Sequence, residues 1–430
     1  MQKKKLLIIA YYWPPAGGPG VQRWLKFVKY LPAFGVHPIV YVPKNAAYPL
    51  LDETLLEDLK GIDYTLLQTP INEPNQWLAK LFKKQSKTMS SGVIKPQSKQ
   101  SLFEKFLLWA RGNLFIPDSR ITWVKPSVRF LENFLSENQV DAMVTTGPPH
   151  SIHLIGLALK QSTQLPWLAD FRDPWTEINY HDQLYLSKFA QKRHQTLESN
   201  VLQLVDTLVT TSEATKKLLA KKTKKPIFTI TNGYDEINQV TYKKDQIFSL
   251  SHIGSLLSNR NPEVLWEVLA EIIKENDAFK NAFQLNLIGK VSQEILETLN
   301  KFEVDSFCHV TAYVSHQEAI KLQKQAQVLL FIEENSLAGS YIIGGKLFEY
   351  LVADTPIIAI GPAHSDVQQI LKETNTGAYF YYNEKERLKA HVLDLFTLFE
   401  NNQLKQQPIG LQKYHRKALT QQLVNSIPWV

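Results

Sequence analysis

Short apolar runs alternate with stretches of helical spacing along most of this chain of 430 residues. The first run, LLIIAYY at 6–12, has the length and composition of a buried strand. The apolar positions that follow it recur as they do on one face of a helix: Val21, Leu25, Val28 and Leu31. Repetition of this pattern predicts parallel, doubly wound α/β domains. The other runs that predict strands are HPIVYV (37–42), AMVTTG (142–147), PWLADF (166–171), TLVTTS (207–212), PIFTIT (226–231), FSLSHIG (248–254), FQLNLIG (283–289), QVLLFI (327–332) and TPIIAIG (355–361).

A second cycle of strand, glycine loop and helix begins at Phe248, so the pattern predicts two Rossmann-like domains. We expect the N-terminal domain to cover residues 1–235 and the C-terminal domain residues 236–408, with the junction in TNGYDEINQVTYKKD. The remaining segment, 409–430, contains an amphipathic helical pattern over 411–427. We expect this last helix to pack against the first domain.

Two neighbouring segments differ from the alternating pattern. Residues 83–101 are rich in Lys, Ser and Gln and show no periodicity, which is typical of a mobile loop. The segment FEKFLLWARGNLF at 103–115 is aromatic and basic. It fits a packed amphipathic helix, and alternatively a contact with a membrane or a lipid-linked acceptor.

Composition restricts the class of protein and its compartment. Hydrophobic residues make up 44% of the chain and charged residues 21%, which is a globular composition. Cys308 is the single cysteine, so a disulfide framework is excluded and a reducing compartment is favoured. The start, MQKKKLLIIAYYW, resembles a signal peptide, but prolines and glycines follow instead of a cleavage site. Because no run approaches the ~20 apolar residues that span a bilayer, we expect a cytoplasmic protein, at most peripheral at the inner face of the plasma membrane.

The net charge of +7 indicates anionic partners. The basic residues are spread along the chain, without a dense basic tract or an RNA-binding motif, so nucleic acid is not expected as a partner. Phosphorylated small molecules and an anionic membrane surface are the remaining partners for these lysines and arginines.

The stretch PPAGGPGVQRWLKF at 14–27 places three glycines between the first strand and the first helix. Gly17 and Gly18 would let a ligand approach the backbone, and a helix N-terminus attracts phosphate. A plain turn between strand and helix is the structural alternative. A dinucleotide site would need an acidic residue at the end of the second strand, where Lys44 stands instead, so NAD is disfavoured.

Two further strand ends in the N-terminal half carry candidate catalytic side chains. His150 follows TTGPP at a helix start and could donate a hydrogen bond to an acceptor or a donor sugar. A solvated histidine is the alternative. In LADFRDPW, Asp170 and Asp173 flank Arg172 directly after a buried strand. Such a group can act as a base, orient hydroxyls or hold a phosphate, whereas a salt-bridged loop is the structural alternative.

In the C-terminal half, SHIGSLLSNRNPE at 251–263 has the chemistry of a pyrophosphate site. Gly254 and Ser255 end a predicted strand, and Arg260 precedes a predicted helix. A bare glycine backbone beside a positive charge suits an anionic diphosphate. Taken alone, this stretch is a weak signal.

The stretch SLAGSYIIGGKLFEYL at 336–351 predicts a second donor-binding element. Gly345 opens a helix whose first turn carries Lys346 and Glu349. Exposed helix N–H groups and the Lys346 ammonium could meet phosphate, and the Glu349 carboxylate could accept both hydroxyls of a ribose. The structural alternative is a capped helix with an acid at its positive end.

In this order, the five sites resemble the GT-B glycosyltransferases, and among them the retaining family 4 group, over nearly the whole chain. TNGYD at 231–235 supports the likeness, and PPHS followed by DFRDPW is similar to a bacterial subgroup that makes surface polysaccharides. The resemblance implies two Rossmann-like domains facing a cleft, a nucleotide-sugar donor on the second domain, a glycan or lipid-linked acceptor on the first, and no metal. It also implies that Arg260 holds the donor diphosphate and Glu349 the ribose, and that Gly17 and Gly18 lie near the diphosphate or sugar.

The chain departs from the family pattern at three positions. Ser255 stands where an arginine is usual, and Tyr341 stands where the first of two glutamates spaced by seven residues is usual. Glu333 or Glu334 could substitute for that glutamate. The family usually has a histidine after the strand that corresponds to PWLADF (166–171). That histidine is also missing here, because Asp170 or Arg172 occupies the region.

The resemblance implies retaining sugar transfer, in which the departing diphosphate is stabilised by Arg260, Lys346 and a helix N-terminus. No carboxylate nucleophile is evident, which favours attack of the acceptor hydroxyl from the front side over a covalent intermediate. Two other functions stay open at this point. One is a sugar-nucleotide 2-epimerase of the same fold, and the other is a non-catalytic nucleotide-sugar-binding protein.

Overall fold

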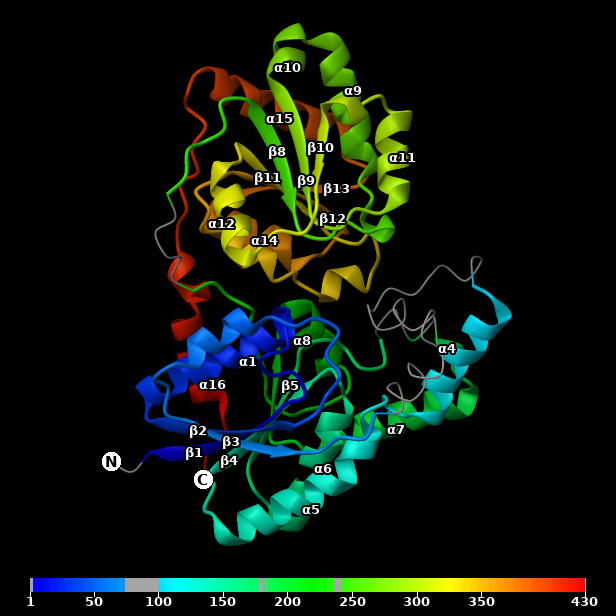
Figure 1. Cartoon of the computed structure of the whole chain (residues 1–430), viewed down its shortest axis with the longest axis vertical. Coiled ribbons are helices and arrows are strands. Elements are labelled where there is room, and N and C mark those ends of the chain that lie inside the picture. The colour runs from blue at the N-terminus through cyan, green and yellow to red at the C-terminus, as the bar shows by residue number, and fades with distance from the viewer. Residues whose placement is uncertain (1–2, 74–99, 178–180, 182–183, 236–240, 430) are drawn as a thin grey trace. The chain divides into compact units, whose positions relative to one another are not determined.

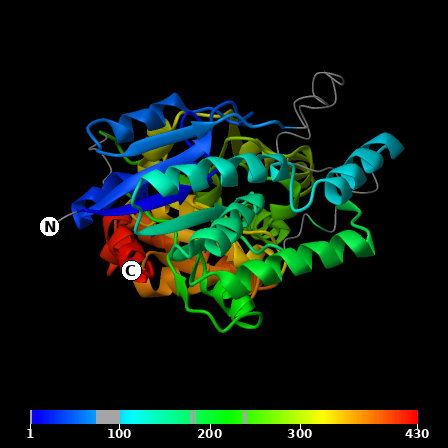
Figure 2. The ribbon, with the colours of Figure 1, turned by 90° about the horizontal axis from the view of Figure 1, so that it is seen from below.

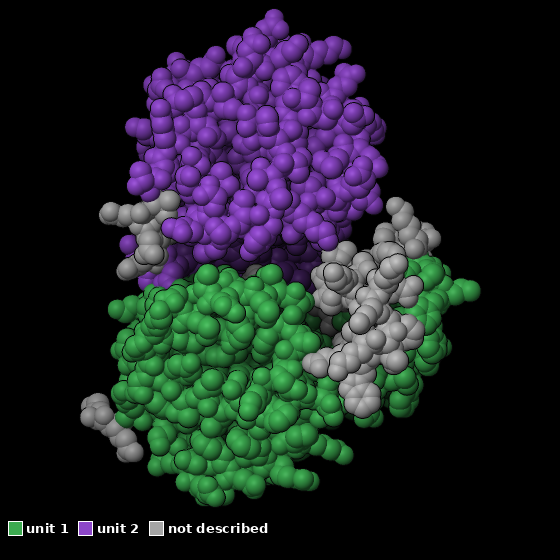
Figure 3. Space-filling model, in the orientation of Figure 1, with its two compact units in different colours: residues 1–231, 416–430 green, residues 232–415 purple. Residues whose placement is uncertain are grey.

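The computed structural model describes residues 3–73, 100–177, 181, 184–235 and 241–429. The chain divides into two compact units, which we call unit 1 (residues 1–231 and 416–430) and unit 2 (residues 232–415) (Figure 3). The division after Thr231 comes earlier than the expected one after residue 235, and residues 409–415 belong to unit 2. The loop predicted at 83–101 lies outside the described residues as far as residue 99.

Unit 1 is built on a seven-stranded parallel sheet with the order β3-β2-β1-β4-β5-β6-β7 (Figure 1). The chain starts in the middle of this sheet, extends to one edge and then returns to build the other, as in doubly wound folds. The strands are β1 (Lys4–Ile9), β2 (Val36–Pro43), β3 (Thr65–Thr69), β4 (Ala142–Gly147), β5 (Trp167–Phe171), β6 (Thr207–Thr210) and β7 (Ile227–Thr229).

Unit 2 repeats this arrangement with a six-stranded parallel sheet in the order β10-β9-β8-β11-β12-β13. Its strands are β8 (Phe248–Ile253), β9 (Phe283–Ile288), β10 (Cys308–Thr311), β11 (Val328–Ile332), β12 (Ile357–Gly361) and β13 (Gly377–Tyr381). The strand order reverses between β8 and β11, as it does between β1 and β4 in unit 1. In parallel sheets, ligands bind beyond the carboxyl ends of the strands at such a reversal.

All the strands predicted from apolar runs are confirmed, and the strands that the pattern missed lie at sheet edges. β3, β10 and β13 are the edge strands concerned. β3 and β10 are half-buried or exposed along their whole length, and only two residues of β13 are buried. A strand that is covered on only part of its surface needs no continuous apolar run, so periodicity does not reveal it.

Helices cover both faces of the sheet of unit 1. On one face, α1 packs beside α16, and on the other α5, α6 and α7 run side by side (Figures 1 and 2). Strand residues alternate between these layers: Leu6 and Ile8 face α1, whereas Leu7 and Ile9 face the opposite layer. The helices are α1 (Pro19–Tyr30), α4 (Leu102–Leu114), α5 (Ile121–Glu137), α6 (Ser151–Thr163), α7 (Lys188–Leu204), α8 (Glu213–Ala220) and α16 (Arg416–Ser426).

Unit 2 has the same three layers. Side chains of α9, α11 and α15 join one core beside the sheet, and those of α13 and α14 join the core on its other face. The helices are α9 (Glu263–Glu275), α10 (Asp277–Ala282), α11 (Gln293–Lys301), α12 (His316–Gln325), α13 (Lys346–Tyr350), α14 (Asp366–Thr374) and α15 (Lys385–Glu400). Within the described parts of both units, no helix has the length and apolarity needed to cross a bilayer.

The C-terminal helix is shorter than its sequence pattern suggests. Residues Leu411–Tyr414 form a 3-10 helix in unit 2, and α16 starts at Arg416. The α16 residues Leu419 and Leu423 enter the core beside α1, so the last element of the chain completes unit 1.

We therefore expect Leu423→Ala to lower the stability of unit 1. Leu423 is fully buried, and removing a buried leucine side chain costs about 2–5 kcal/mol of unfolding free energy. Urea unfolding followed by tryptophan fluorescence measures the change. Gln422→Ala, at an exposed position of the same helix, is the matched control. Equal loss in both variants would contradict a core role for α16.

Candidate functional site

A half-buried lysine and a fully buried histidine mark the carboxyl edge of the sheet of unit 2, at the strand-order reversal. Nζ of Lys346, the first residue of α13, lies 2.9 Å from Nε2 of His252 on β8. The other ring nitrogen of His252, Nδ1, is 3.0 Å from the carbonyl oxygen of Leu330 on β11. The contact thus joins the two strands between which the chain reverses.

The Lys346 side chain has no carboxylate partner among the described residues. The face of the Phe331 ring lies 5.8 Å from Nζ, a favourable but weak contact for a cation. Burial lowers the pKa of Lys346 well below the usual lysine range, and the nearby charge of Arg260 acts in the same direction. An ammonium that is partly removed from water without a counter-ion is costly unless an anion reaches it.

Arg260 is a second cation at the same edge. It ends a short 3-10 helix, Ser258–Arg260, and its guanidinium makes no hydrogen bond or ion pair within the described residues. Its charge influences the pKa values of Lys346, His252 and Glu333, so it lies near all three. Two cations of like charge without a carboxylate partner form a site suited to a multiply charged anion.

The predicted glycines of unit 2 differ in what they contribute. Gly254 directly follows β8 and has a φ of 129°, which residues with a side chain rarely adopt, and a Cβ there would lie 3.3 Å from Nζ of Lys346. Its bare backbone therefore leaves the ammonium accessible, and Ser255 beside it is exposed. Gly345 precedes α13, but that helix has only five residues. The expected phosphate site at a helix N-terminus is therefore not supported, because the dipole of so short a helix is small.

Glu349, expected to bind ribose, is already engaged by α12. Its carboxylate accepts hydrogen bonds from Nε2 of His316 (3.0 Å) and Nε2 of Gln323 (3.1 Å). The side chain of Glu349 is 23% exposed, and that of His316 is 53% exposed. A ribose could reach the carboxylate if the exposed His316 ring moves away. Glu349 and Lys346 thus lie on the same helix, and ribose binding by Glu349 stays a prediction.

Of the two substitutes for the missing glutamate, Glu333 is buried and Glu334 is accessible. The Glu333 carboxylate accepts hydrogen bonds from Ser365 (3.0 Å) and Tyr379 (2.8 Å). Burial raises the pKa of Glu333 to about 7. Glu334 is half-buried and accepts a hydrogen bond of 2.9 Å from Asn259, the neighbour of Arg260. Glu334 therefore fits a role at the cationic edge better than Glu333 does.

In unit 1, Asp170 is the anchor of α1. Its carboxylate is fully buried and accepts a two-atom hydrogen bond from Arg23, at 3.0 and 3.2 Å. The Trp24 indole (2.7 Å) and the Thr146 hydroxyl (3.0 Å) donate to it as well. Burial alone would raise the pKa of Asp170, but Arg23, Arg172 and Trp24 outweigh it and hold that pKa below its usual value. This environment favours the structural alternative, and a catalytic role for Asp170 stays a prediction.

Arg172 fastens the turn after β4 to the start of α1. Its Nε donates to the carbonyl oxygen of Gly147 at 3.2 Å, and Nη2 donates to that of Pro148. Its Nη1 packs so closely on Gly20 that a Cβ at that position would overlap it. Gly17 is held by a 2.9 Å hydrogen bond to the Leu50 carbonyl, and Gly18 directly precedes α1. The absence of a side chain at Gly20 is thus required by Arg172, independently of any ligand, whereas the ligand role predicted for Gly17 and Gly18 stays a prediction.

His150 is buried, contrary to the alternative of a solvated histidine. Its ring stacks on the Trp175 indole with centroids 4.9 Å apart, and neither ring nitrogen has a hydrogen-bond partner among the described residues. Burial lowers its pKa well below the usual histidine range, with His153 and Arg172 acting in the same direction. His150 therefore packs as a buried, neutral ring on Trp175, two residues after Asp173. Asp173 is half-buried, has no hydrogen bond within the described residues, and has its pKa raised by burial.

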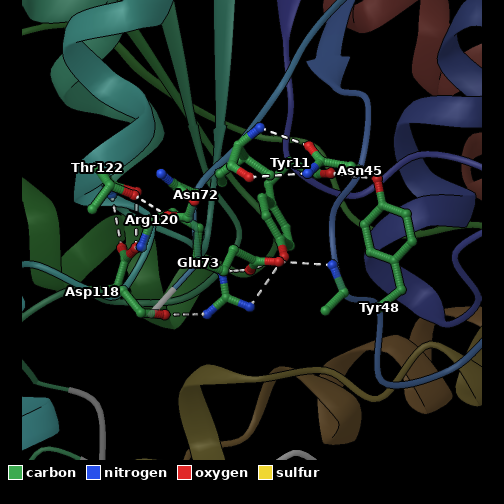
Figure 4. A network of polar contacts seen from close by, with 12 residues as sticks. Tyr11, Asn45, Tyr48, Asn72, Glu73, Asp118, Arg120 and Thr122 are labelled. Carbon is green, nitrogen blue, oxygen red and sulfur yellow. Dashed lines mark hydrogen bonds and ion pairs between the residues drawn. The ribbon is translucent and has the colours of Figure 1, made fainter. Parts of the chain in front are cut away.

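A polar network that sequence reasoning did not predict ties three loops of unit 1 together (Figure 4). The Tyr11 hydroxyl donates to the buried Glu73 carboxylate at 2.6 Å, and Nε of Arg120 lies 3.3 Å from the same carboxylate oxygen. The neighbouring Asp118 carboxylate accepts the N–H of Ser151 at 2.9 Å and so caps α6. The ends of β1 and β3 and the start of α6, next to His150, are thereby fixed relative to one another.

Some of the missed residues had a signal in the sequence. His252 places a polar ring inside an apolar run, which is a mark of function when the strand is buried on both faces. Arg23 falls among the apolar positions of α1 and is only 5% exposed. Glu73 follows β3, a strand without an apolar run, so nothing in the sequence indicated its burial.

Comparisons with known proteins support the fold. No family model matches the chain, and no curated protein matches it. Solved structures do match. One is a glycosyltransferase from Rickettsia africae, with 14% identity, a TM-score of 0.57 and coverage of 99% of this chain and 95% of that one. Another is WaaG, a glycosyltransferase involved in lipopolysaccharide biosynthesis, with 13% identity, a TM-score of 0.55 and coverage of 98% of this chain and 99% of that one. A third is HepE from Anabaena in complex with UDP-glucose, with 12% identity, a TM-score of 0.56 and coverage of 98% of each chain. The chain therefore has the GT-B fold of these glycosyltransferases over its whole length.

Asp170→Asn tests the structural role of that carboxylate. The substitution leaves the Arg23 guanidinium buried without its counter-ion, which costs about 3–5 kcal/mol of unfolding free energy at pH 7. Because the folded pKa of Asp170 is depressed, its contribution is present above roughly pH 4 and is lost as the pH falls through the folded pKa. Denaturant unfolding at pH 7 and below pH 4 measures this difference.

Asp173→Asn is the matched control, since Asp173 makes no ion pair within the described residues and its substitution should change stability by less than about 1 kcal/mol. A variant Asp170→Asn with normal stability and no activity would contradict the anchoring role and support a catalytic one.

Proposed function

We propose that this protein is a glycosyltransferase that moves a sugar from a nucleoside diphosphate sugar to a glycan or lipid-linked acceptor. The observation that carries the proposal is the pair of cations, Lys346 and Arg260, without a carboxylate partner in the described part of unit 2. They lie at the strand-order reversal, the position at which doubly wound sheets bind nucleotides. That HepE, which shares the fold, was solved with UDP-glucose supports a nucleotide-sugar donor.

The donor is expected to bind through its charged and hydroxyl groups. Lys346 and Arg260 hold the diphosphate, and the open backbone at Gly254 lets it approach the Lys346 ammonium. Glu349 takes the ribose hydroxyls in exchange for the side chain of His316. Glu334 faces the transferred sugar in place of the glutamate that Tyr341 replaces. In this proposal α13 binds both the diphosphate, through Lys346, and the ribose, through Glu349, and the residues that follow β8 and β11 bind the diphosphate and the sugar.

Transfer proceeds with retention and without a metal. The bond between the anomeric carbon and the diphosphate oxygen breaks, and negative charge grows on the leaving diphosphate. Lys346 and Arg260 stabilise this charge from fixed positions in a water-poor site, which is the largest contribution that such a site makes to rate. The acceptor oxygen bonds to the anomeric carbon from the same face, and the departing phosphate takes its proton. The acceptor binds at the carboxyl edge of the sheet of unit 1, next to Asp173.

Titration calorimetry with UDP, GDP, ADP and NAD tests the donor site. We expect one nucleoside diphosphate to bind, and NAD not to bind. Arg260→Ala and Lys346→Met should each weaken binding about 10–100-fold, because a hydrogen bond to a charged group contributes about 1.5–3 kcal/mol. Glu349→Ala should weaken it as well, without loss of folding.

Lys274→Ala, at an exposed position of α9, is the control for an equal change in net charge. Binding by none of the four nucleotides would contradict the donor site. Binding without transfer to any acceptor would indicate a non-catalytic nucleotide-sugar-binding protein, and conversion of the donor without an acceptor would indicate a 2-epimerase.

We further propose that α4 contacts an anionic membrane surface. Ser101 and Glu104 form a capping box that starts the helix, but only Leu108 and Gly112 are buried. The exposed side includes Leu102 (86% exposed), Phe106 (59%) and Trp109 (40%), and Phe189 at the start of α7 is 72% exposed. Lys105 and Arg111 lie on the same helix. An apolar aromatic surface beside basic residues suits the interface of an anionic membrane, where lipid-linked acceptors lie.

The double variant Phe106→Ser, Trp109→Ser should bind vesicles that contain anionic lipid at least tenfold more weakly, because burying each ring contributes about 1.5–3 kcal/mol. Vesicle sedimentation measures the partition. Tyr313→Ser, which removes a ring that is 79% exposed in unit 2, is the control. Equal partition of the double variant and the wild type would rule out α4 as the contact.

A further inference from the structure

A pocket of about 440 Å³ lies in unit 1, between the first turns of α7 and the segment that connects β5 to this helix. Its volume is in the range of small-molecule sites, ~300–1,000 Å³. Two glutamines, two histidines, a threonine, a tyrosine and a leucine line it. None of the residues predicted to be catalytic or donor-binding is among them, so the pocket is a feature separate from the sites described above.

Every described side chain that lines the pocket is uncharged. The Trp175 indole N–H can only donate, and it donates to Nδ1 of His194 at 3.1 Å. His194 is therefore a neutral ring with its proton on Nε2, because a protonated Nδ1 could not accept this hydrogen bond. Burial lowers the pKa of His181, the other lining histidine, to about 3. Glu198, one turn further along α7, is paired with Lys222 at 2.7 Å. A pocket with this lining suits a neutral polar ligand better than a phosphate or a carboxylate.

The polar groups of the lining match the hydroxyl groups of a sugar. Gln191 and Gln195 lie four residues apart on one face of α7, and each amide supplies donors and an acceptor. Nε2–H of His194, which makes no hydrogen bond within the described residues, adds a donor. Sugar hydroxyls both donate and accept, so such a set can satisfy them. Leu186 and the His181 ring add apolar surface for the C–H groups of a sugar ring.

One wall of the pocket has a strained backbone that α4 holds in place. Tyr185 has a left-handed φ of 49°, which a bulky residue rarely adopts. Asn113 near the end of α4 donates to the Tyr185 carbonyl at 3.2 Å and accepts the N–H of Ser187 at 2.8 Å. Gly112 lies so close to Leu186 that a Cβ at Gly112 would overlap it. Strain of this kind is concentrated at ligand-binding sites, which is a second indication that the pocket binds a ligand.

Trp175 connects the pocket to the edge of the sheet where the acceptor is expected. The face of its indole stacks on His150, and its N–H donates to His194. Thr176, which lines the pocket, comes three residues after Asp173, so their backbones are at most about 11 Å apart. A ligand in the pocket and a hydroxyl group near Asp173 can therefore belong to one molecule.

We propose that this pocket binds a neutral sugar unit of the acceptor, separate from the unit whose hydroxyl group reacts. The inference deepens the proposed function, on which its link to sugar transfer rests. Unit 1 would then select its acceptor by a sugar that takes no part in the reaction. The pocket recognises a neutral hexose or N-acetylhexosamine, which either a free glycan or a lipid-linked one can supply.

Saturation-transfer NMR with the whole chain tests the pocket. The probes are the methyl glycosides of glucose, galactose, mannose and N-acetylglucosamine, with methyl glucuronide as the anionic comparison. We expect at least one neutral glycoside to bind, and to bind more tightly than the glucuronide. The double variant Gln191→Ala, Gln195→Ala should bind it at least about fivefold more weakly, because two hydrogen bonds are lost. Both glutamines are exposed, so the variant should fold normally.

Gln203→Ala, at an exposed position of the same helix, is the matched control and should bind like the wild type. Binding by none of the four neutral glycosides, tighter binding of the glucuronide, or unchanged binding in the double variant would overturn the assignment. Nucleotide binding is measured on the same preparation. Glycoside binding without nucleotide binding would contradict the donor site and the link to transfer, whereas the reverse would contradict the pocket alone.

Sedimentation with phosphatidylglycerol vesicles, with and without diglucosyl diacylglycerol, distinguishes the two sources of the sugar. Binding that increases with the glycolipid, and does so less in the double glutamine variant, would support a lipid-linked acceptor in the pocket. Binding of a methyl glycoside without any effect of the glycolipid would support a free glycan.

Discussion

The partial burial of one lysine that has no carboxylate partner among the described residues is the constraint on which the chemistry of unit 2 depends. Charged groups are removed from water only at a cost of several kcal/mol, and most proteins recover it with a counter-ion. Here Lys346 meets a neutral imidazole, an aromatic ring and a second cation. An anion that reaches this edge of the sheet would supply the missing counter-charge. The electrostatics of this edge of the sheet thus point to an anionic ligand.

In unit 1, by contrast, the buried carboxylate of Asp170 is paired with the buried guanidinium of Arg23. Asp170 collects hydrogen bonds from Arg23, Trp24 and Thr146, and it thereby holds α1 on the sheet. Arg172 then fills the space that Gly20 leaves open. The same residues that looked catalytic in sequence fix the backbone at the edge of the sheet. A rigid edge of this kind is what a site needs if an acceptor hydroxyl is to be placed accurately.

Whether the sequence predicted a strand or helix depended on how completely its residues are buried and on how local its sequence pattern is. Central strands such as β4 and β12 are covered on both faces, so they appear as apolar runs, whereas the edge strands β3, β10 and β13 do not. The glycines and cations after β8 and before α13 were recognised because strand ends bind ligands in this fold class. The length of α13 was not, because a five-residue helix has the same local pattern as a longer one.

The sequence by itself determined the fold class and the cationic edge, since both follow from local order: apolar runs, glycines and charges at the ends of strands. Only the tertiary structure decided which charges are paired. Arg23 meets Asp170, and His252 meets Lys346, across 147 and 94 residues of sequence. Whether an acid is an anchor or remains free to react depends on such distant partners and on exclusion of water. The residues next to an acid along the chain determine neither its distant partner nor its exclusion from water.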